Sequence, residues 1–285
     1  MTFRSTLSFA GRLLDKFVND DVLTLSAALS FYTLLSFAPL MVLAVWATSL
    51  IGPGAEEAML GQISALAGGD ARMAAQAVID SANKHPSLGS MAGIIGIVIS
   101  IVGATTVFAQ LQSSLNRIWG ITSQPSNAIL SWLRRRVLSV GVIAAIVFVL
   151  VVSLLASSAL GLLLTRNGAW WDVINQVIST IVFAALFTML FRYLPDARLP
   201  WRRAAWGGLV TAVLFGLGKW LIGFYLSRGD VGGAYGAAGS LVVLLVWVYY
   251  SSTIFFIGAE SVQVWLQGRG ETIEPASSAA PAEGR

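Results

Sequence analysis

Two ionisable residues, Lys219 and Glu260, stand in long apolar stretches of the sequence. A charged side chain at the centre of a membrane helix costs about 2.5 to 3.5 kcal/mol on insertion scales, so such residues usually pair with a partner or carry a function. Lys219 is suited to binding an anionic headgroup, and Glu260 to acting as a gate or a structural latch. These two residues are the first candidates for function.

Glu260 comes near the end of the last apolar run, with Tyr249 on roughly the same helical side. Lys219 lies about 15 residues, or about 22 Å, from the corresponding end of its own run, so a direct contact between the two charges is not expected. We expect Glu260 to pair with an arginine at the same membrane boundary. The candidates are Arg117, Arg136 and Arg192.

The environment of Lys219 has two interpretations. It follows Gly208 by 11 residues, which places it on the helical face that carries Gly208, Ala212 and Gly216. Small residues are the usual contact between membrane helices, so this face predicts that Lys219 points into the helix bundle. The alternative is a lysine whose long side chain reaches the outer interface.

Backbone flexibility is expected at two places. Glycines crowd the entry to the last apolar run, and a proline interrupts the first. Both are typical of bends or hinges, although close packing explains the glycines as well. The candidate hinge residues are Pro39, Gly232, Gly233, Gly236 and Gly239.

These residues must be positioned by membrane helices, because 56% of the chain is hydrophobic and only 11% is charged. A hydrocarbon core of about 30 Å takes about 20 helical residues to cross. Six runs are long enough, and the first carries several serines and threonines. They lie near residues 23–50, 91–111, 137–164, 173–194, 204–226 and 241–266. The sequence therefore predicts an all-α, multi-pass membrane protein.

The segments outside these runs set the orientation. With the N-terminus inside, 13 of the 18 lysines and arginines fall on the cytoplasmic side, which satisfies the positive-inside rule. Residues 1–22 have the pattern of an amphipathic helix lying on the inner leaflet. The outer loop between residues 53 and 89 is expected to form two short helices, and residues 267–285 a disordered cytoplasmic tail.

Several kinds of chemistry are not expected. The 14 acidic residues are scattered, the chain has one histidine and no cysteine, and no phosphate-binding glycine motif occurs. We therefore expect no catalytic residues, no metal site and no cofactor. The net charge of +4 is explained by the bias that orients the helices, so nucleic acid binding is not expected either.

Six stretches of the sequence resemble one known family. They read LSAALSFYTLLSFAPL, LQSSLNRIWG, FRYLPD, GKWLIGFYL, YGAAGS and WVYYSSTIFFIGAE. In this order they are similar to the YihY/BrkB family of bacterial inner-membrane proteins. The matching positions are Pro39, Asn116, Trp119, Pro195, Lys219, Tyr225, Tyr235, Gly236, Gly239, Tyr249, Gly258 and Glu260.

The resemblance implies a six-helix protein of the inner membrane, and it supplies no catalytic role. The distribution of lysines and arginines predicts that both termini are in the cytoplasm. The older family label, ribonuclease BN, is not supported by the scattered acidic residues. We expect a transport-related or flippase-like role for an envelope amphiphile. The alternative is a non-transporting envelope organiser that recruits partners. Membrane lipids are the expected partners, with envelope proteins or a homo-oligomer as further candidates.

Overall fold

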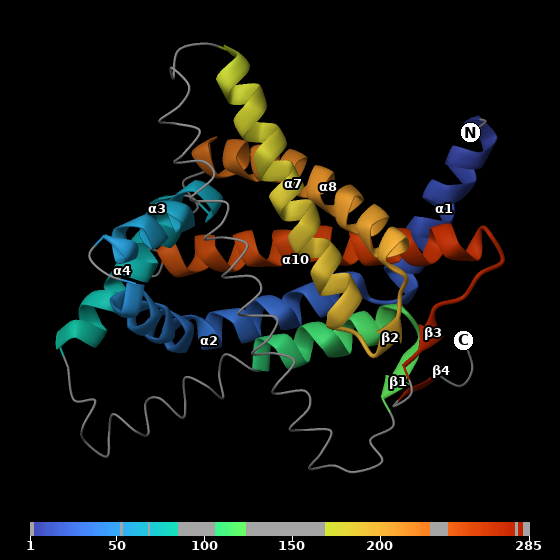
Figure 1. The fold of residues 1–285 in the computed structure, drawn as a ribbon, viewed down its shortest axis with the longest axis horizontal. Helices are drawn as coiled ribbons and strands as arrows, with labels where there is room; N and C mark the ends of the chain where they lie inside the picture. Colours follow the sequence, from blue (N-terminus) through green and yellow to red (C-terminus); the bar gives the residue numbers. More distant parts are fainter. Residues whose placement is uncertain are drawn as a thin grey trace. The chain divides into compact units, whose positions relative to one another are not determined.

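The computed structural model describes residues 3–51, 54–67, 69–84, 106–123, 169–228, 239–276 and 279–281. These residues form helices and two small sheets (Figure 1). The chain divides into two compact units. Unit 1 comprises Met1–Val22, Leu111–Leu217 and Ile254–Arg285, and unit 2 comprises Leu23–Gln110 and Gly218–Thr253.

The labelled helices of the described residues have the following bounds: α1 (Phe3–Asn19), α2 (Val22–Ile51), α3 (Ala55–Ala67), α4 (Gly69–Lys84), α7 (Ala169–Tyr193), α8 (Trp201–Arg228) and α10 (Gly239–Gln267). Residues 106–118 are helical as well. Helices α2, α7, α8 and α10 cover the first, fourth, fifth and sixth expected spans. The third expected span and most of the second lie outside the described residues.

Two stretches of the described chain are long and apolar enough to cross a membrane. They are Gln176–Tyr193 in α7 and Leu241–Gln267 in α10, and a shorter apolar stretch covers Val22–Phe37 in α2. In α2 the helix continues through Pro39. The helical, apolar character of the chain is confirmed, whereas the number of six spans and the bend at Pro39 stay predictions.

Individual residues terminate the helices of unit 1. Asp21 separates α1 from α2 with a left-handed φ of 53°, which aspartate tolerates better than most residues. Gly120 lies just after the end of helix 106–118. Its φ is 65°, and its N–H donates to the carbonyl of Arg117 at 3.1 Å. A glycine in this conformation is the common end of a helix. Pro195 follows the end of α7, where it cannot continue the helical hydrogen bonding.

Phenylalanines on one side of α7 form the core of unit 1. The Phe183 ring packs 5.0 Å from Phe215 of α8, and the Phe191 ring packs 4.9 Å from Phe255 of α10. Phe187 lies between them, 5.8 Å from Phe215 and 5.7 Å from Phe255. Such ring pairs contribute about 0.5 to 1.5 kcal/mol beyond their buried area. They hold α7, α8 and α10 together.

Glycines allow these three helices to approach closely. A Cβ at Gly208 of α8 would lie 2.7 Å from the carbonyl oxygen of Ala184 in α7. A Cβ at Gly258 of α10 would overlap the hydroxyl of Thr211 in α8. Ala212, on the same face, is buried. The small-residue face predicted on this part of α8 is therefore a helix contact.

The C-terminal tail differs from the disordered end that its composition predicts. Strand β3 (Glu274–Pro275) pairs antiparallel with β2 (Ala197–Arg198), and β4 (Ala279–Pro281) pairs antiparallel with β1 (Ile121–Ser123). The pairing uses backbone groups, which do not depend on side-chain composition. The tail is thereby attached to the segments that follow helix 106–118 and α7.

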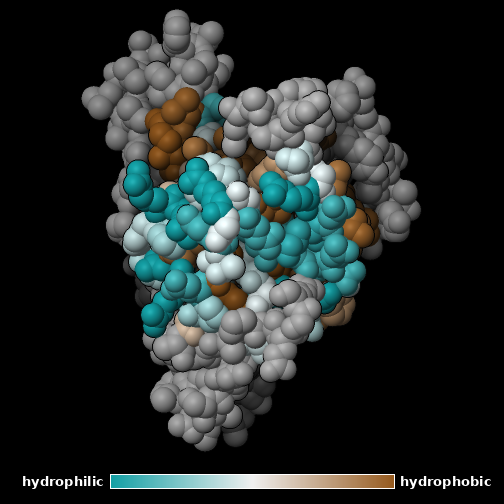
Figure 2. All heavy atoms as spheres, turned by 90° about the vertical axis from the view of Figure 1, so that its right-hand side faces the viewer, coloured by the Kyte–Doolittle hydropathy of each residue, from teal (hydrophilic) through white to brown (hydrophobic). Residues whose placement is uncertain are grey.

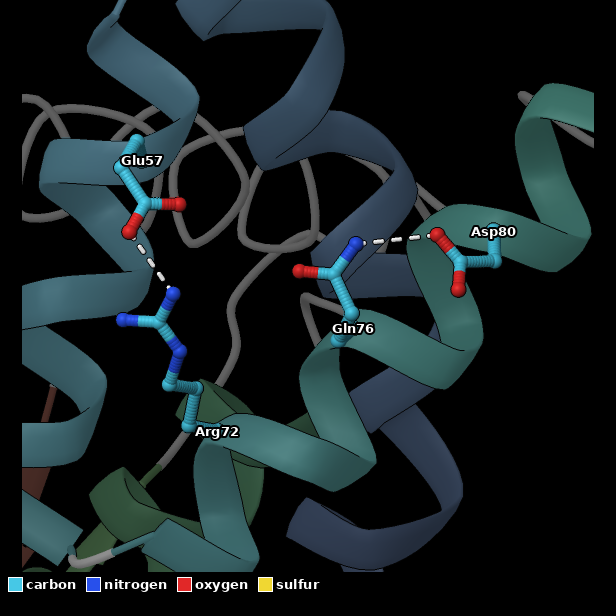
Figure 3. A network of polar contacts seen from close by, with 4 residues as sticks. All are labelled: Glu57, Arg72, Gln76 and Asp80. Carbon is cyan, nitrogen blue, oxygen red and sulfur yellow. Dashed lines mark hydrogen bonds and ion pairs between the residues drawn. The ribbon is translucent and has the colours of Figure 1, made fainter.

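In unit 2, α3 and α4 form a helical hairpin. Leu60, Ala75 and Ile79 make its buried core. On its surface, Arg72 pairs with Glu57 at 2.7 Å (Figure 3). The side-chain amide of Gln76 donates to the carboxylate of Asp80, one turn further along α4, at 2.9 Å. The expectation of two short helices in this segment agrees with α3 and α4, while their side of the membrane stays a prediction.

Candidate functional site

Two distant segments of unit 1 meet at a buried polar contact. Asn116, near the end of helix 106–118, donates from Nδ2 to Asp196 Oδ2 at 3.0 Å. Its Oδ1 accepts the backbone N–H of Asp196 at 2.9 Å, and Gln112 Nε2 reaches Asp196 Oδ1 at 3.3 Å. The backbone carbonyl of Asp196 accepts from Ala276 of the tail at 2.9 Å. This arrangement fixes the segment after α7 against helix 106–118 and the tail.

Two further hydrogen bonds fix these segments, one to α10 and one between the end of α7 and the segment that follows it. The Trp119 indole N–H donates to the carbonyl of Ala259, next to Glu260, at 3.2 Å. Arg192, in the last turn of α7, donates from Nη1 to the carbonyl of Leu199 at 2.7 Å. The stretches LQSSLNRIWG, FRYLPD and WVYYSSTIFFIGAE, which resemble the YihY/BrkB family, therefore meet in unit 1.

Glu260 is fully buried, with 0% of its surface exposed. Its neighbours in the helix are buried as well, among them Ala259 and Ser261, whose hydroxyl donates to the carbonyl of Gly258 at 2.7 Å. A carboxylate removed from water is strongly destabilising unless charge or hydrogen bonds compensate it.

The arginines expected to pair with Glu260 have the following positions. Arg117 pairs through Nη2 with Asp21 Oδ2 at 2.7 Å, and this pair is largely exposed. Arg192 bonds the Leu199 carbonyl as described. Arg136 lies outside the described residues. The pairing of Glu260 with one of these arginines stays a prediction.

The remaining sequence candidates are placed in part. Lys219 lies within α8, but its side chain is outside the described part of the structure, so both interpretations of it stay predictions. Tyr249 is half-buried in α10, and its carbonyl accepts the hydroxyl of Thr253 at 2.9 Å. Of the candidate hinge glycines, Gly239 begins α10, whereas the other three lie outside the described residues.

A cavity lies next to the end of α10 in unit 1. It has a volume of about 320 Å³ and is lined by α1, by the residues that end helix 106–118 and by the tail. The lining includes Lys16, Trp119, Gln263 and Glu271. A second cavity of about 360 Å³ shares Lys16 and Gln267 with the first. Hydrophilic residues gather on the face that carries α1, the end of α10 and the strands (Figure 2).

Ion pairs and aromatic contacts surround this cavity. Lys16 Nζ lies 3.6 Å from Asp20 Oδ2, and Arg203 Nη2 lies 2.5 Å from Glu271 Oε2. The Arg269 guanidinium lies 4.2 Å above the Trp265 ring. Aromatic and basic residues together are typical of a membrane–water boundary, as the sequence predicts for this end of the helices.

Sequence reasoning did not identify Asp196, Gln112 or the cavity. Asp196 and Asn116 are 80 residues apart, so spacing alone gives no sign of their contact. Asp196 does end the FRYLPD stretch, which was the available signal. Among the residues that the structure describes, no three His, Cys, Asp or Glu side chains are grouped to hold a metal ion.

Comparisons with known proteins place this chain among membrane proteins. It is 29% identical over 271 residues to a UPF0761 membrane protein of Legionella pneumophila, covering 91% of this chain and 62% of that relative. It is 28% identical over 276 residues to one of Alkalilimnicola ehrlichii, covering 91% of this chain and 58% of that relative. The chain thus spans about three fifths of these relatives' length. No solved structure matches it.

A family model described as Virulence factor BrkB matches residues 13–283. That range contains the polar contact of Asn116 with Asp196, the buried Glu260 and the cavity at the end of α10. It also contains both apolar stretches that are long enough to cross a membrane. The chain therefore belongs to the BrkB family of membrane proteins.

Proposed function

We propose that this protein moves an envelope amphiphile across the bacterial inner membrane, in a transport-related or flippase-like role. The observation that carries the proposal is the complete burial of Glu260 within an apolar helix long enough to cross a membrane. A carboxyl group at such a position is costly, and in membrane proteins it usually marks a pathway or a switch. A role of Glu260 as a gate that closes the cytoplasmic side explains why a costly carboxyl group is present at this position.

The cavity beside α10 supports this proposal. Gln263, one helical turn after Glu260, lines the cavity, so the buried carboxyl and the opening share one helix. A movement of α10 that changes the surroundings of Glu260 also changes this cavity. Such a movement would therefore affect a polar headgroup held there. We place the helices in a six-span arrangement with both termini in the cytoplasm, which puts the cavity on the cytoplasmic side.

Polar groups along α2 give a second line of support. Ser26, Ser30 and Ser36 are buried, and the Thr33 hydroxyl donates to the carbonyl of Leu29 at 2.8 Å. Hydroxyls in a membrane helix provide polar contacts without the cost of a charge. The protein then acts on lipids without chemical conversion, and we propose no enzymatic activity and no nucleic acid partner.

Reconstitution tests the proposal. Purified protein is incorporated into liposomes that contain labelled lipids with anionic, zwitterionic and neutral headgroups, and the label reaching the other leaflet is measured over time. We expect movement faster than in protein-free vesicles for at least one headgroup. Movement at the protein-free rate for every headgroup would refute the proposal.

The α3–α4 hairpin favours a second candidate, an envelope organiser that recruits partners. The hairpin has a core of its own, and Met73 on its surface is 59% exposed. Exposed apolar side chains on a folded element are suited to binding another protein, although a single one is common. Crosslinking with mass spectrometry separates the two roles. A stoichiometric partner that is lost when residues 55–84 are deleted would favour the organiser.

A further inference from the structure

The two cavities of unit 1 form adjacent parts of one site. The cavity of about 320 Å³ at the end of α10 and the cavity of about 360 Å³ along α1 share Lys16 and Gln267. Each has the size of a small-molecule site, for which about 300 to 1,000 Å³ is usual. All the residues that line them belong to the described part of the chain, and none of them has a role so far.

The cavity at the end of α10 favours a positively charged group. Its ionisable lining consists of one lysine and two acids, Glu271 and Glu274. The acids outnumber the lysine, and Glu271 keeps a second carboxylate oxygen besides the one that meets Arg203. The C-terminal end of α10 adds the negative end of a helix dipole, which also favours a cation.

A buried amide in the same wall needs a partner. Gln263 is 9% exposed, lines the cavity, and its Oε1 finds no hydrogen-bond partner among the described residues. An acceptor that is buried without a partner costs about 1 to 3 kcal/mol. A ligand that donates hydrogen bonds, such as a primary ammonium group, satisfies this oxygen and is attracted by the acids.

The adjacent cavity provides cationic groups on α1. Arg12 and Lys16 are one helical turn apart and both line it, together with Asp15 and Asp20. Arginine and lysine are the usual partners of a phosphate group. The site as a whole therefore offers a place for an ammonium group and, beside it, a place for a phosphate group.

The helix that carries these cations also fits a membrane surface. Leu14 and Val18 of α1 are 65% and 68% exposed, and α1 is strongly amphipathic. Such helices lie in the headgroup layer with their apolar face toward the acyl chains. In that position α1 brings Arg12 and Lys16 to the depth of lipid headgroups.

We propose that this site binds a phosphoethanolamine group, with the ammonium near Gln263 and the two acids and the phosphate near Arg12 and Lys16. The proposal names the headgroup class of the transported amphiphile and so rests on the proposed function. The same group occurs in a membrane lipid and in a small soluble molecule. Binding measurements distinguish these two sources.

The test measures binding to the full-length protein in detergent by calorimetry. The probes are short-chain phosphatidylethanolamine, phosphatidylcholine and phosphatidylglycerol, and free phosphoethanolamine. We expect saturable binding of the ethanolamine lipid, about tenfold tighter than the other two lipids, because choline cannot donate hydrogen bonds and glycerol carries no positive charge. Free phosphoethanolamine binding as tightly as the lipid would indicate a soluble ligand for the same site.

Variants localise the binding. Lys16→Ala and Glu274→Gln each lower the affinity about tenfold. Glu274 is exposed, so Glu274→Gln preserves folding, whereas Lys16 is 25% exposed and pairs with the buried Asp20, so Lys16→Ala is compared only as folded, monodisperse protein. The matched control is Glu57→Gln on the α3–α4 hairpin, which leaves the affinity unchanged. Equal affinity for all three lipids, or wild-type affinity in both site variants, would overturn the proposal.

The result is separable from the test of transport. Selective binding in a protein that moves no lipid supports the site and refutes the transport role. Lipid movement without any preference for ethanolamine supports transport and refutes the site.

Discussion

Replacing Asn116 with alanine tests whether the contact between helix 106–118 and the segment after α7 holds unit 1 together. Asn116 is 6% exposed and makes two hydrogen bonds with Asp196, one to the carboxylate and one from the backbone N–H. The substitution removes both bonds and leaves the Asp196 carboxylate with fewer hydrogen bonds. The contact is therefore expected to contribute far more than a similar contact on the surface.

The magnitude follows from the two bonds. A hydrogen bond to a charged group contributes about 1.5 to 3 kcal/mol, and one between neutral groups about 0.5 to 1.5 kcal/mol. Together they predict a loss of about 2 to 4.5 kcal/mol for Asn116→Ala. The matched control is Gln76→Ala, because Gln76 Nε2 donates to Asp80 Oδ1 at 2.9 Å in an exposed position (Figure 3). That loss is expected to be below about 0.5 kcal/mol.

Equilibrium unfolding in mixed detergent micelles measures both losses as changes in the free energy of unfolding. A double-mutant cycle with Asp196→Ala then isolates the interaction of the two residues, for which we expect at least about 1.5 kcal/mol. The reasoning is refuted if Asn116→Ala destabilises the protein no more than Gln76→Ala does.

Two further predictions concern the packing of α10. Gly258→Ala destabilises the protein, because its Cβ would overlap Thr211, whereas Gly61→Ala, where nothing lies within 4 Å, does not; melting temperatures in detergent compare them. Equal melting temperatures would contradict the close approach. Trp119→Phe keeps the ring packing but removes the hydrogen bond to the Ala259 carbonyl, so a loss of about 1 kcal/mol is expected. An unfolding midpoint equal to the wild type would show that this bond contributes nothing.

The apolar runs predicted the helices because long hydrophobic stretches must satisfy their backbone hydrogen bonds internally. The bounds of α10, Gly239–Gln267, differ from the expected 241–266 by two residues at the start and one at the end. Glycine spacing likewise predicted the contact face of α8 at Gly208 and Ala212. In both cases the relevant residues are neighbours along one helix, so a local pattern contains the information.

Contacts between distant segments could not be predicted in this way. Asn116 meets Asp196 across 80 residues, and the tail pairs with β1 and β2 through its backbone, which side-chain composition does not report. The cavity arises where three segments that are distant in the sequence meet, so no single stretch of sequence marks it. The structure shows that Glu260 is buried, while its function and its role as latch or gate stay predictions.

The most direct test of the proposed function measures lipid movement in liposomes that contain equal amounts of wild-type protein, Glu260→Gln or the surface control Glu57→Gln. Only variants that remain monodisperse and folded are compared, and Glu260→Asp serves in place of Glu260→Gln if the latter unfolds. We predict that wild type and Glu57→Gln move the ethanolamine lipid at the same rate and that the Glu260 variant moves it at least about tenfold more slowly. Equal rates for all three proteins would contradict the account.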